Sequence, residues 1–531
     1  MTDVTVGALA PPRPARKAEQ SDFRKKLGFF SMVLGMFMAI LDIQIVSSSL
    51  REIQAGLSAS ADEISWIQTS YLIAEVVMIP LSGTLSRLLS TRVLFVMSAA
   101  AFTASSLLCA LAWNIESMIV FRVLQGFLGG AMIPTVFASL YIMFPPEKRA
   151  GVSVLIGLTA TMAPTIGPTL GGYLTQLMSW HWLFLINVVP GTAVVIMVWT
   201  LLDIDRPDRT LLKGFDFLGL LFMALFLGSL EFVMEEGPRK DWFENSYITD
   251  FTVLAAVAAV AFFWRVLTYK QPIVDLRSFR DRNFAVGCLY AFIIGIGLYG
   301  AVYIVPQFLG QVRQYNSLQI GTIMAVVGIF QCMSAPIAGA MARKFDPRVL
   351  LTLGLTLFAT GLFLNSRLTA DASFGEFFLP QAVRGLALIL CMLPINQLAL
   401  GTLSPLALKN ASGLFNLMRN LGGAIGLAGI NTVIADRLAL HQARLADNLN
   451  IGRPEVQSVL DGLSARLAVT MPGDTDKMAI KVVWQMLTRE AYVLTFNDCL
   501  LIMAGVFAMG LLFMPLLRKP KPAPAGAAGG H

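Results

Sequence analysis

Apolar stretches of about twenty residues alternate with short polar loops along almost all of the 531-residue chain. A helix needs about twenty apolar residues to cross the hydrocarbon core of a bilayer. The pattern therefore predicts an all-α membrane protein with about fourteen spanning helices. These are expected at residues 27–50, 64–83, 93–112, 117–144, 150–177, 183–202, 216–235, 248–267, 284–309, 318–342, 348–365, 377–401, 411–435 and 492–517.

The composition agrees with a membrane protein and narrows its chemistry. Hydrophobic residues make up 56% of the chain and charged residues only 14%, against about 25% charged in ordinary soluble domains. The net charge of +7 comes from short Lys/Arg clusters between apolar runs, so we expect no nucleic-acid partner. The five cysteines and three histidines lack metal-ligand spacing, and no nucleophile with a base is evident. We therefore expect neither an enzyme nor a metal or other cofactor.

Lys and Arg are concentrated in alternate loops, which orients the chain. The positive-inside rule places both termini in the cytosol, with polar tails at 1–26 and 518–531. The long polar segment 436–490 then lies outside, and its helical apolar spacing suggests that the last two helices project beyond the membrane. This segment is interpreted either as a solvated helical hairpin or as a docking surface for a periplasmic protein.

An internal repeat indicates two related halves. Gly83 opens the loop sequence GTLSRLLSTR, and Gly339 opens the similar GAMARKFDPR. A duplication with two inserted helices explains the spacing, as in transporters built from repeats. We therefore expect an N-terminal six-helix bundle at 27–205, a linker with helices seven and eight at 206–270, and a C-terminal six-helix bundle at 271–517.

Charged residues inside the apolar spans are the candidates for function. Asp42 lies about eight residues before the outer end of the first helix, and Arg122 about eight residues after the outer start of the fourth. At ~1.5 Å per residue both are ~12 Å deep, and Glu75 in the second helix is ~15 Å deep. A carboxylate in this layer could carry protons, with Glu231 in helix seven as a further candidate. The alternative is that Asp42 and Arg122 form a fixed structural pair.

The ninth helix carries three tyrosines that could line a drug-sized apolar pocket, namely Tyr290, Tyr299 and Tyr303. Such residues are also common as packing or lipid contacts. Arg384 is deep in the twelfth helix, where an amide or carbonyl neighbour would satisfy it.

Several motifs together resemble the major facilitator superfamily, specifically its 14-helix EmrB/QacA-type drug:proton antiporters, over about residues 28–517. LDIQIV from Leu41 resembles the family's first-helix acid motif, and FRVLQGFLGG, with Arg122 and Gln125, resembles its fourth-helix motif. WHWLFLIN from Trp180 and GLFNLMRNLGGAIG from Gly413 resemble further signatures of the EmrB branch. GLTATMAPTIGPTLGGYL resembles the antiporter motif of exporters, matched by Gly157, Pro164, Gly167, Pro168, Gly171 and Gly172.

The resemblance implies a proton-coupled exporter of amphipathic drugs or toxic compounds in the bacterial inner membrane, with Asp42 as the protonatable residue. Export of a dedicated metabolite, such as a siderophore or fatty acid, is the alternative. Gln125, Arg384 and Asn416 join the three tyrosines as candidate cavity residues. EmrB-type permeases work with a periplasmic adaptor and an outer-membrane channel, so similar partners are expected here, besides membrane lipid and a small-molecule substrate.

The chain departs from the family in the gating loop, residues 83–92. The family pattern usually has Asp and Gly where this chain has Arg87 and Ser90, while Gly83 and Arg92 agree with the pattern.

Overall fold

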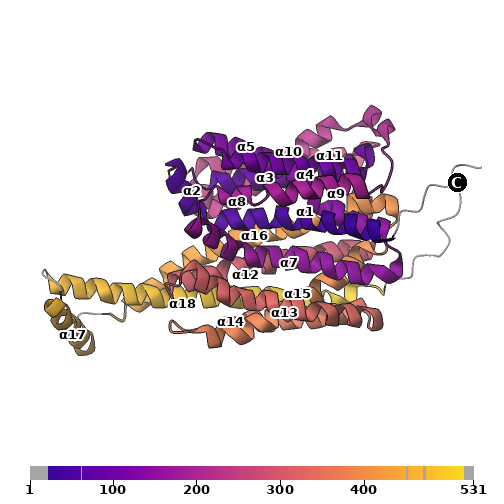
Figure 1. The fold of residues 1–531 in the computed structure, drawn as a ribbon. Helices are drawn as coiled ribbons and strands as arrows, with labels where there is room; N and C mark the ends of the chain where they lie inside the picture. The colour runs from indigo at the N-terminus through magenta and orange to yellow at the C-terminus, as the bar shows by residue number, and fades with distance from the viewer. Residues whose placement is uncertain (1–21, 61–62, 450–451, 471–473, 520–531) are drawn as a thin grey trace, which may run out of the picture.

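The computed structural model describes residues 22–60, 63–449, 452–470 and 474–519, and within these it contains helices but no strands (Figure 1). Fourteen helical segments in the described residues are long and apolar enough to cross a membrane, and each coincides with one of the predicted spans. The prediction of an all-α, multi-pass membrane protein is therefore confirmed. Of the expected tails at 1–26 and 518–531, residues 1–21 and 520–531 lie outside the described residues.

The amino-terminal half contains six spans. The first helix begins at Asp22, inside the expected tail, where the Asp22 carboxylate lies 2.8 Å from the Lys26 ammonium one turn later. Two spans are divided, the fourth between α5 and α6 and the sixth between α8 and α9. The helices are α1 (Asp22–Ser48), the short α2 (Leu50–Leu57), α3 (Trp66–Leu89), α4 (Thr91–Ala110), α5 (Ile115–Gly129), α6 (Met132–Met143), α7 (Pro146–Leu177), α8 (Trp182–Leu185) and α9 (Val188–Leu201).

An inserted helical hairpin and the carboxy-terminal half follow. The hairpin consists of α10 (Phe217–Glu236) and α11 (Ser246–Thr268), with short 3-10 turns η1 (Arg209–Gly214), η2 (Gly237–Arg239) and η3 (Trp242–Glu244) beside it. The second half contains η4 (Leu276–Arg280), α12 (Arg282–Gln311), α13 (Ser317–Lys344), α14 (Pro347–Asn365), α15 (Phe374–Leu400), α16 (Pro405–Ala446), α17 (Pro454–Thr470), α18 (Thr475–Leu512) and η5 (Met514–Leu516).

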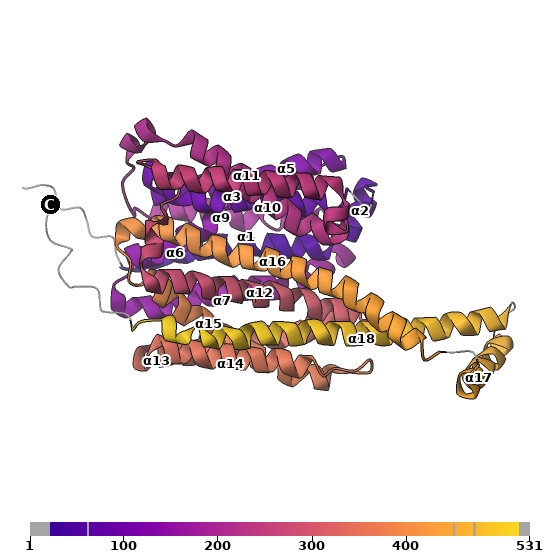
Figure 2. The ribbon, with the colours of Figure 1, turned by 180° about the vertical axis from the view of Figure 1, so that it is seen from behind.

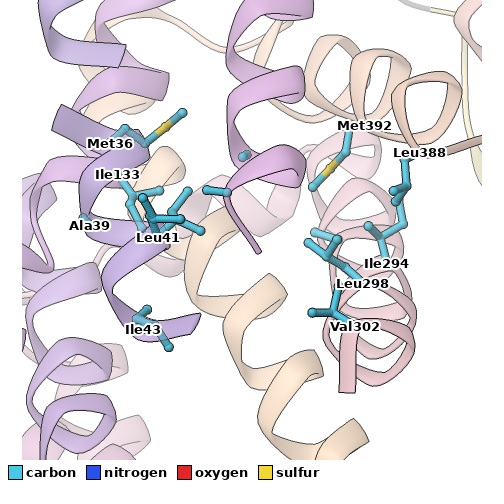
Figure 3. Packing of buried hydrophobic residues seen from close by; sticks show 14 of the residues in the cluster. Met36, Ala39, Leu41, Ile43, Ile133, Ile294, Leu298, Val302, Leu388 and Met392 are labelled. Atoms are coloured by element: carbon cyan, nitrogen blue, oxygen red, sulfur yellow. The ribbon is translucent and has the colours of Figure 1, made fainter. Parts of the chain in front are cut away.

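Apolar side chains of both halves form one continuous buried cluster, and the two halves meet along a few helices. Figure 3 shows Met36 and Ile133 from the first half and Ile294 and Met392 from the second, all buried. Across the interface α7 packs on α13 and α15, while α16 packs on α3 and α6. The inserted α10 contacts both α3 and α16, so it lies beside the seam between the halves.

Two helices extend well beyond the rest at one end of the bundle. α16 and α18 project together, and α17 lies at their tip (Figures 1 and 2). The His441 imidazole Nε2 lies 2.9 Å from an oxygen of Asp498, which joins the two long helices. We call this the projecting end, and the opposite end, where α1 begins, the terminal end. The last two spanning helices thus project beyond the rest of the bundle, while the placement of segment 436–490 outside the membrane stays a prediction.

Candidate functional site

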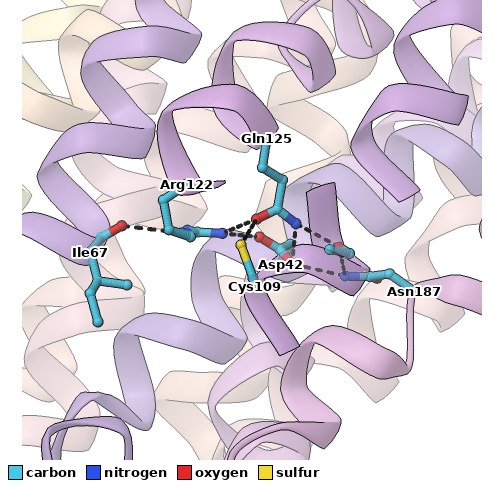
Figure 4. Close-up of polar contacts among 7 residues, drawn as sticks. Asp42, Ile67, Cys109, Arg122, Gln125 and Asn187 are labelled. Atoms are coloured by element: carbon cyan, nitrogen blue, oxygen red, sulfur yellow. Dashed lines mark hydrogen bonds and ion pairs between the residues drawn. The ribbon is translucent and has the colours of Figure 1, made fainter. Parts of the chain in front are cut away.

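Asp42 and Arg122 form an ion pair in the amino-terminal half. Arg122 Nη1 on α5 lies 2.6 Å from Asp42 Oδ2 on α1, and both side chains are 0% exposed (Figure 4). The two residues, which the sequence predicted to lie at the same depth, are thus in direct contact. An uncompensated charge inside a membrane costs several kcal/mol, so each residue depends on the other.

Three neutral side chains complete the surroundings of the Asp42 carboxylate. Asn187 Nδ2 donates to Asp42 Oδ1 over 2.8 Å, and Gln125 Nε2 donates to the same oxygen over 3.2 Å. Ser106 Oγ accepts from both amides, at 3.2 Å from Asn187 and 2.6 Å from Gln125. The carboxylate is thus held by donors from α5 and the start of α9, braced by Ser106 on α4.

Arg122 is held on its other side by the backbone and an aromatic ring. Its Nε donates to the carbonyl of Ile67 over 3.1 Å, and its Nη1 also donates to Gln125 Oε1 over 2.6 Å. The guanidinium carbon lies 4.2 Å from the centre of the Tyr71 ring. Within the described residues Nη2 has no hydrogen-bond partner. Arg122 therefore keeps one free donor group while α3 and α5 fix its position.

The sequence did not identify Asn187, Ser106 and Tyr71 as members of this network. Asn187 closes the quoted WHWLFLIN stretch, so a buried amide inside an apolar span was the available signal. Ser106 and Tyr71 gave no such signal, because serine and tyrosine are common in spanning helices.

A small cavity of about 50 Å³ lies where α1, α3, α10, α12 and α16 meet. Glu75 and Glu231, both predicted candidates, line it together with Glu235, which the sequence did not single out. The other lining residues are Ile43, Gln44, Gln68, Leu72, Val76, Tyr299, Asn420, Gly423, Ala424 and Leu427. Asp42 is not among them, although its neighbours Ile43 and Gln44 are, so Asp42 is sealed from this cavity in the present conformation.

Of the six residues suggested for a substrate cavity, Tyr299 lines this one, and its hydroxyl lies 3.4 Å from Asn420 Oδ1. Gln125 instead belongs to the Asp42 network. Tyr303 is bound to Asn431 Oδ1 at 2.8 Å, further along the same two helices.

The structure places the other three away from this cavity. The Tyr290 hydroxyl donates to the Gly510 carbonyl on α18 over 2.9 Å, and Asn416 donates to the Ser412 carbonyl of its own helix over 2.9 Å. Arg384 donates to Gln381 Oε1 over 2.7 Å, so an amide neighbour does partner it.

The antiporter-motif residues lie on α7, which runs without interruption through Pro164 and Pro168. A side chain at Gly167 would collide with Gln44, and one at Gly171 would lie 2.6 Å from Ser48 Oγ and 2.8 Å from the Ile45 carbonyl. Gly172 is also buried, whereas Gly157 faces α15, with Met392 Cβ 3.7 Å from where its side chain would begin. Glycine thus lets α7 approach α1 within a few residues of Asp42.

The gating loop lies against the second half at the terminal end. A side chain at Gly83 would come within 2.8 Å of the Asn410 backbone. The Arg87 carbonyl accepts from the Asp208 backbone N–H over 2.9 Å, and Arg92 Nη1 donates to the Leu202 carbonyl over 2.9 Å.

The acid at this end comes from another segment, because the loop has Arg87 where the family usually has Asp. Asp205, after α9, forms an ion pair with Lys409 on α16, and Lys409 also donates to the Ser86 carbonyl over 3.2 Å. The Thr91 backbone N–H donates to Asp205 Oδ1 over 2.8 Å and fixes the carboxylate against the loop. This contact joins the two halves, and no feature of the sequence singled out Asp205.

Comparison with known proteins identifies relatives along nearly the whole chain. The family profile of the Major Facilitator Superfamily matches residues 32–427. The colistin resistance protein EmrB of Acinetobacter baumannii is 43% identical over 476 residues, covering 90% of this chain and 93% of that protein. The multidrug export protein EmrB of Escherichia coli is 32% identical, with 94% and 97% coverage, and the fatty acid resistance protein FarB of Neisseria gonorrhoeae is 30% identical, also with 94% and 97%.

Solved structures show the same fold at much lower identity. The crystal structure of the human organic anion transporter MFSD10 matches with a TM-score of 0.56 at 13% identity, covering 92% of this chain and 99% of that one. At that identity the likeness concerns the fold alone. Profile, relatives and helix arrangement agree, and the chain belongs to the major facilitator superfamily, within its group of EmrB-type transporters.

Proposed function

We propose that this protein is a proton-coupled antiporter that exports amphipathic drugs or other toxic compounds by alternating access between its two halves. The proton gradient is its energy source, with no cofactor and no enzymatic step. The observation that carries the proposal is the Asp42–Arg122 ion pair, fully buried at 2.6 Å in a chain 43% identical to a colistin resistance transporter. One proton moving through 100 mV supplies about 2.3 kcal/mol, enough for roughly a fifty-fold substrate gradient.

The contacts of Asp42 suggest how a proton could change the conformation. Protonation would remove the negative charge that holds Arg122 Nη1 at Oδ2, while Arg122 would keep the Ile67 carbonyl and Gln125 Oε1 as acceptors. The link between α1 and α5 would then weaken, while the link between α3 and α5 would remain. Since Asp42 is sealed here, protons must reach it after α1 moves, and the close contact of α7 with α1 at Gln44 connects that movement to the second half.

Replacing Asp42 by Asn tests the proposal, because an amide keeps the shape of the side chain and cannot carry the proton. We expect proteoliposomes containing Asp42→Asn to lose substrate transport driven by an imposed pH gradient, while the purified protein still unfolds cooperatively. The readout is substrate flux together with the accompanying pH change inside the vesicles.

Glu116→Gln provides the matched control, since Glu116 is an exposed carboxylate in the first turn of the helix that carries Arg122. This variant should transport substrate with the same proton coupling as the unmodified protein. Unchanged proton coupling in Asp42→Asn would refute the assignment of Asp42. If only Glu75→Gln lost proton coupling, the proton-carrying residue would be Glu75 in the cavity, and not Asp42.

We further propose that the protein lies in the bacterial inner membrane with both termini in the cytosol, and that the projecting end contacts a periplasmic adaptor leading to an outer-membrane channel. The support is the exposed apolar surface of that end, where Val459, Trp484 and Met486 are each more than half exposed. Deleting α17 should leave transport in proteoliposomes intact and abolish drug resistance in cells. Full resistance in cells would contradict adaptor docking at this helix.

Export of a dedicated metabolite such as a siderophore or fatty acid is the second candidate. The relative FarB, named for fatty acid resistance, is the observation that favours it. Competition between fatty acids and cationic dyes for proton-driven uptake into inverted vesicles separates the two candidates.

A further inference from the structure

The inserted α10 places carboxylates in the cavity between the two halves. Glu231 and Glu235 are one helical turn apart on α10, and both line the cavity opposite Glu75 of α3. Residues four apart share a helix face, so α10 presents both acids toward the same space. The inserted hairpin thus contributes to the interior of the molecule as well as connecting its halves.

Glu75 has a free acceptor in this cavity. The residue is only 2% exposed, and its Oε1 has no hydrogen-bond partner among the described residues. A buried acceptor without a partner carries a desolvation cost that a ligand donor or cation would relieve. The amide oxygen of Gln68, on the same helix and also lining the cavity, is likewise buried without a partner in the described part of the chain.

Positive charge around the cavity does not match the three carboxylates. Neither Lys nor Arg is among its described lining residues. Three arginines interact electrostatically with its acids from outside the lining, Arg419 and Arg122 with Glu75 and Arg239 with Glu235. Arg419 Nε and Nη1 have no hydrogen-bond partner among the described residues, and the guanidinium carbon lies 5.8 Å from the centre of the Phe137 ring. Arg122 is already paired with Asp42, and the charged groups that act on Glu231 are the acids Glu235 and Glu75, so negative charge remains in excess in this cavity.

Between the acids the cavity wall is largely apolar. Its apolar lining residues include Ile43, Leu72, Val76 and Leu427. The Tyr299 ring also lines the cavity and lies in the space that a side chain at Gly423 would occupy, so glycine at that position makes room for the ring. Acidic groups set in an apolar and aromatic wall suit a cation whose charge is attached to a hydrophobic body.

We propose that Glu75, Glu231 and Glu235 form a subsite for the positively charged group of an amphipathic organic cation, built jointly by the amino-terminal half and the inserted hairpin. The inference rests on the proposed export function and names one class of substrate for it. At about 50 Å³ the cavity holds only the charged group in the present conformation. Drug-sized ligands need several hundred Å³, so the apolar body enters when the halves separate.

The third glutamate of α10, Glu236, differs from the two that line the cavity. Glu236 is 2% exposed, and its Oε1 accepts a hydrogen bond from Thr69 Oγ1 over 3.1 Å. It does not line the cavity. Glu236 therefore has a structural partner that Glu75 lacks, and it serves as the control for loss of a buried acid on the same helix.

Equilibrium binding of tetraphenylphosphonium to the purified full-length protein tests the subsite. Tetraphenylborate has nearly the same shape and the opposite charge, so it controls for hydrophobic binding. We expect the unmodified protein to bind the phosphonium at least tenfold more tightly than the borate. The double variant Glu231→Gln/Glu235→Gln should weaken phosphonium binding at least tenfold, while Glu236→Gln should leave it within twofold.

Binding of both ions with equal affinity, or full phosphonium affinity in the double variant, would overturn the subsite. If the double variant does not fold, Glu75→Gln takes its place with the same expected loss. The cation subsite and the export function can be refuted independently of each other. Proton-driven export of neutral compounds without phosphonium binding removes only the subsite, whereas phosphonium binding without proton-driven flux of any compound removes the exporter.

Discussion

Each oxygen of the Asp42 carboxylate has a donor, and the donors come from two other parts of the chain, α5 and the start of α9. Oδ2 receives Arg122, and Oδ1 receives Gln125 and Asn187. The sequence predicts the meeting of Asp42 and Arg122, because depth along a helix follows from residue count alone. It does not predict the amides, because the side on which Asn187 points depends on the rotation of its helix against its neighbours.

Removing the Asn187 amide should destabilise the protein, because Asp42 Oδ1 loses the shorter of its two donor contacts. Hydrogen bonds to charged groups contribute about 1.5–3 kcal/mol, so Asn187→Ala should lower the unfolding temperature of the purified protein and reduce proton-coupled flux. Thermal unfolding followed by intrinsic fluorescence measures the first effect. The matched control is Asn448→Ala, because the Asn448 amide donates to the Arg444 carbonyl at the exposed end of α16. An unfolding temperature equal in both variants would show that Asn187 is dispensable to the network.

At the scale of helices, the apolar pattern predicted where the helices lie, but for some helices it did not predict which face points toward the cavity. The fourteen predicted spans agree with the structure because each is a long apolar run. In α12, however, buried residues occur all around the helix. The hydrophobic pattern therefore did not show which of Tyr290 and Tyr299 would face the cavity. Tyr290 is bound to α18, while Tyr299 reaches the cavity. Glu235 was overlooked for a related reason, since it lies near the end of its span, where an acid is usually solvated.

The approach of α5 to α3 positions Arg122 and depends on Gly126. A side chain at Gly126 would collide with the Tyr71 carbonyl of α3, and Arg122, one turn earlier, uses the Ile67 carbonyl of the same helix. Gly126→Ala should therefore push the two helices apart and cost about 1–3 kcal/mol, as overpacking usually does. We expect a lower unfolding temperature and loss of transport.

Gly505→Ala is the control for this substitution, since nothing lies within 4 Å of where that side chain would begin on α18. It should be neutral or stabilise the protein by at most about 1 kcal/mol, because alanine favours the helix. Equal effects of the two substitutions would mean that helix propensity, and not the contact with α3, governs the response at Gly126.

Across the whole molecule, the sequence predicts a duplication with an inserted hairpin, but it does not predict the contacts between these parts. The repeated loops at Gly83 and Gly339 indicated two halves with a hairpin between them. Nothing in the sequence showed that α10 would contact both α3 and α16. Contacts of that kind depend on how the two halves and the inserted hairpin pack against one another, which neither periodicity nor loop charge encodes.

The Asp205–Lys409 pair should hold the terminal end closed, because it joins the first half to the second where α3 meets α16. Both side chains are largely buried, at 17% and 11% exposed, so water screens the pair little. Lys409→Gln should favour the conformation open at this end by about 1–2 kcal/mol, a factor of roughly 5 to 30 in the ratio of open to closed molecules. The measurement is the labelling rate of a cysteine introduced at Asn410, which faces Gly83, with the exposed Cys332 replaced by Ser.

The reversed pair, Asp205→Lys with Lys409→Asp, should bring labelling back toward the original rate, since the attraction between the halves is restored. Lys148→Gln is the control, because Lys148 pairs with Asp22 at the same end over 3.4 Å, but that pair is exposed and lies within one half. Exposed pairs contribute at most about 1 kcal/mol, and this one does not cross the seam, so labelling should not change. If Lys409→Gln left the rate unaltered, the closed end would owe its stability to the close backbone contact at Gly83, and the ion pair would have no part in the conformational equilibrium.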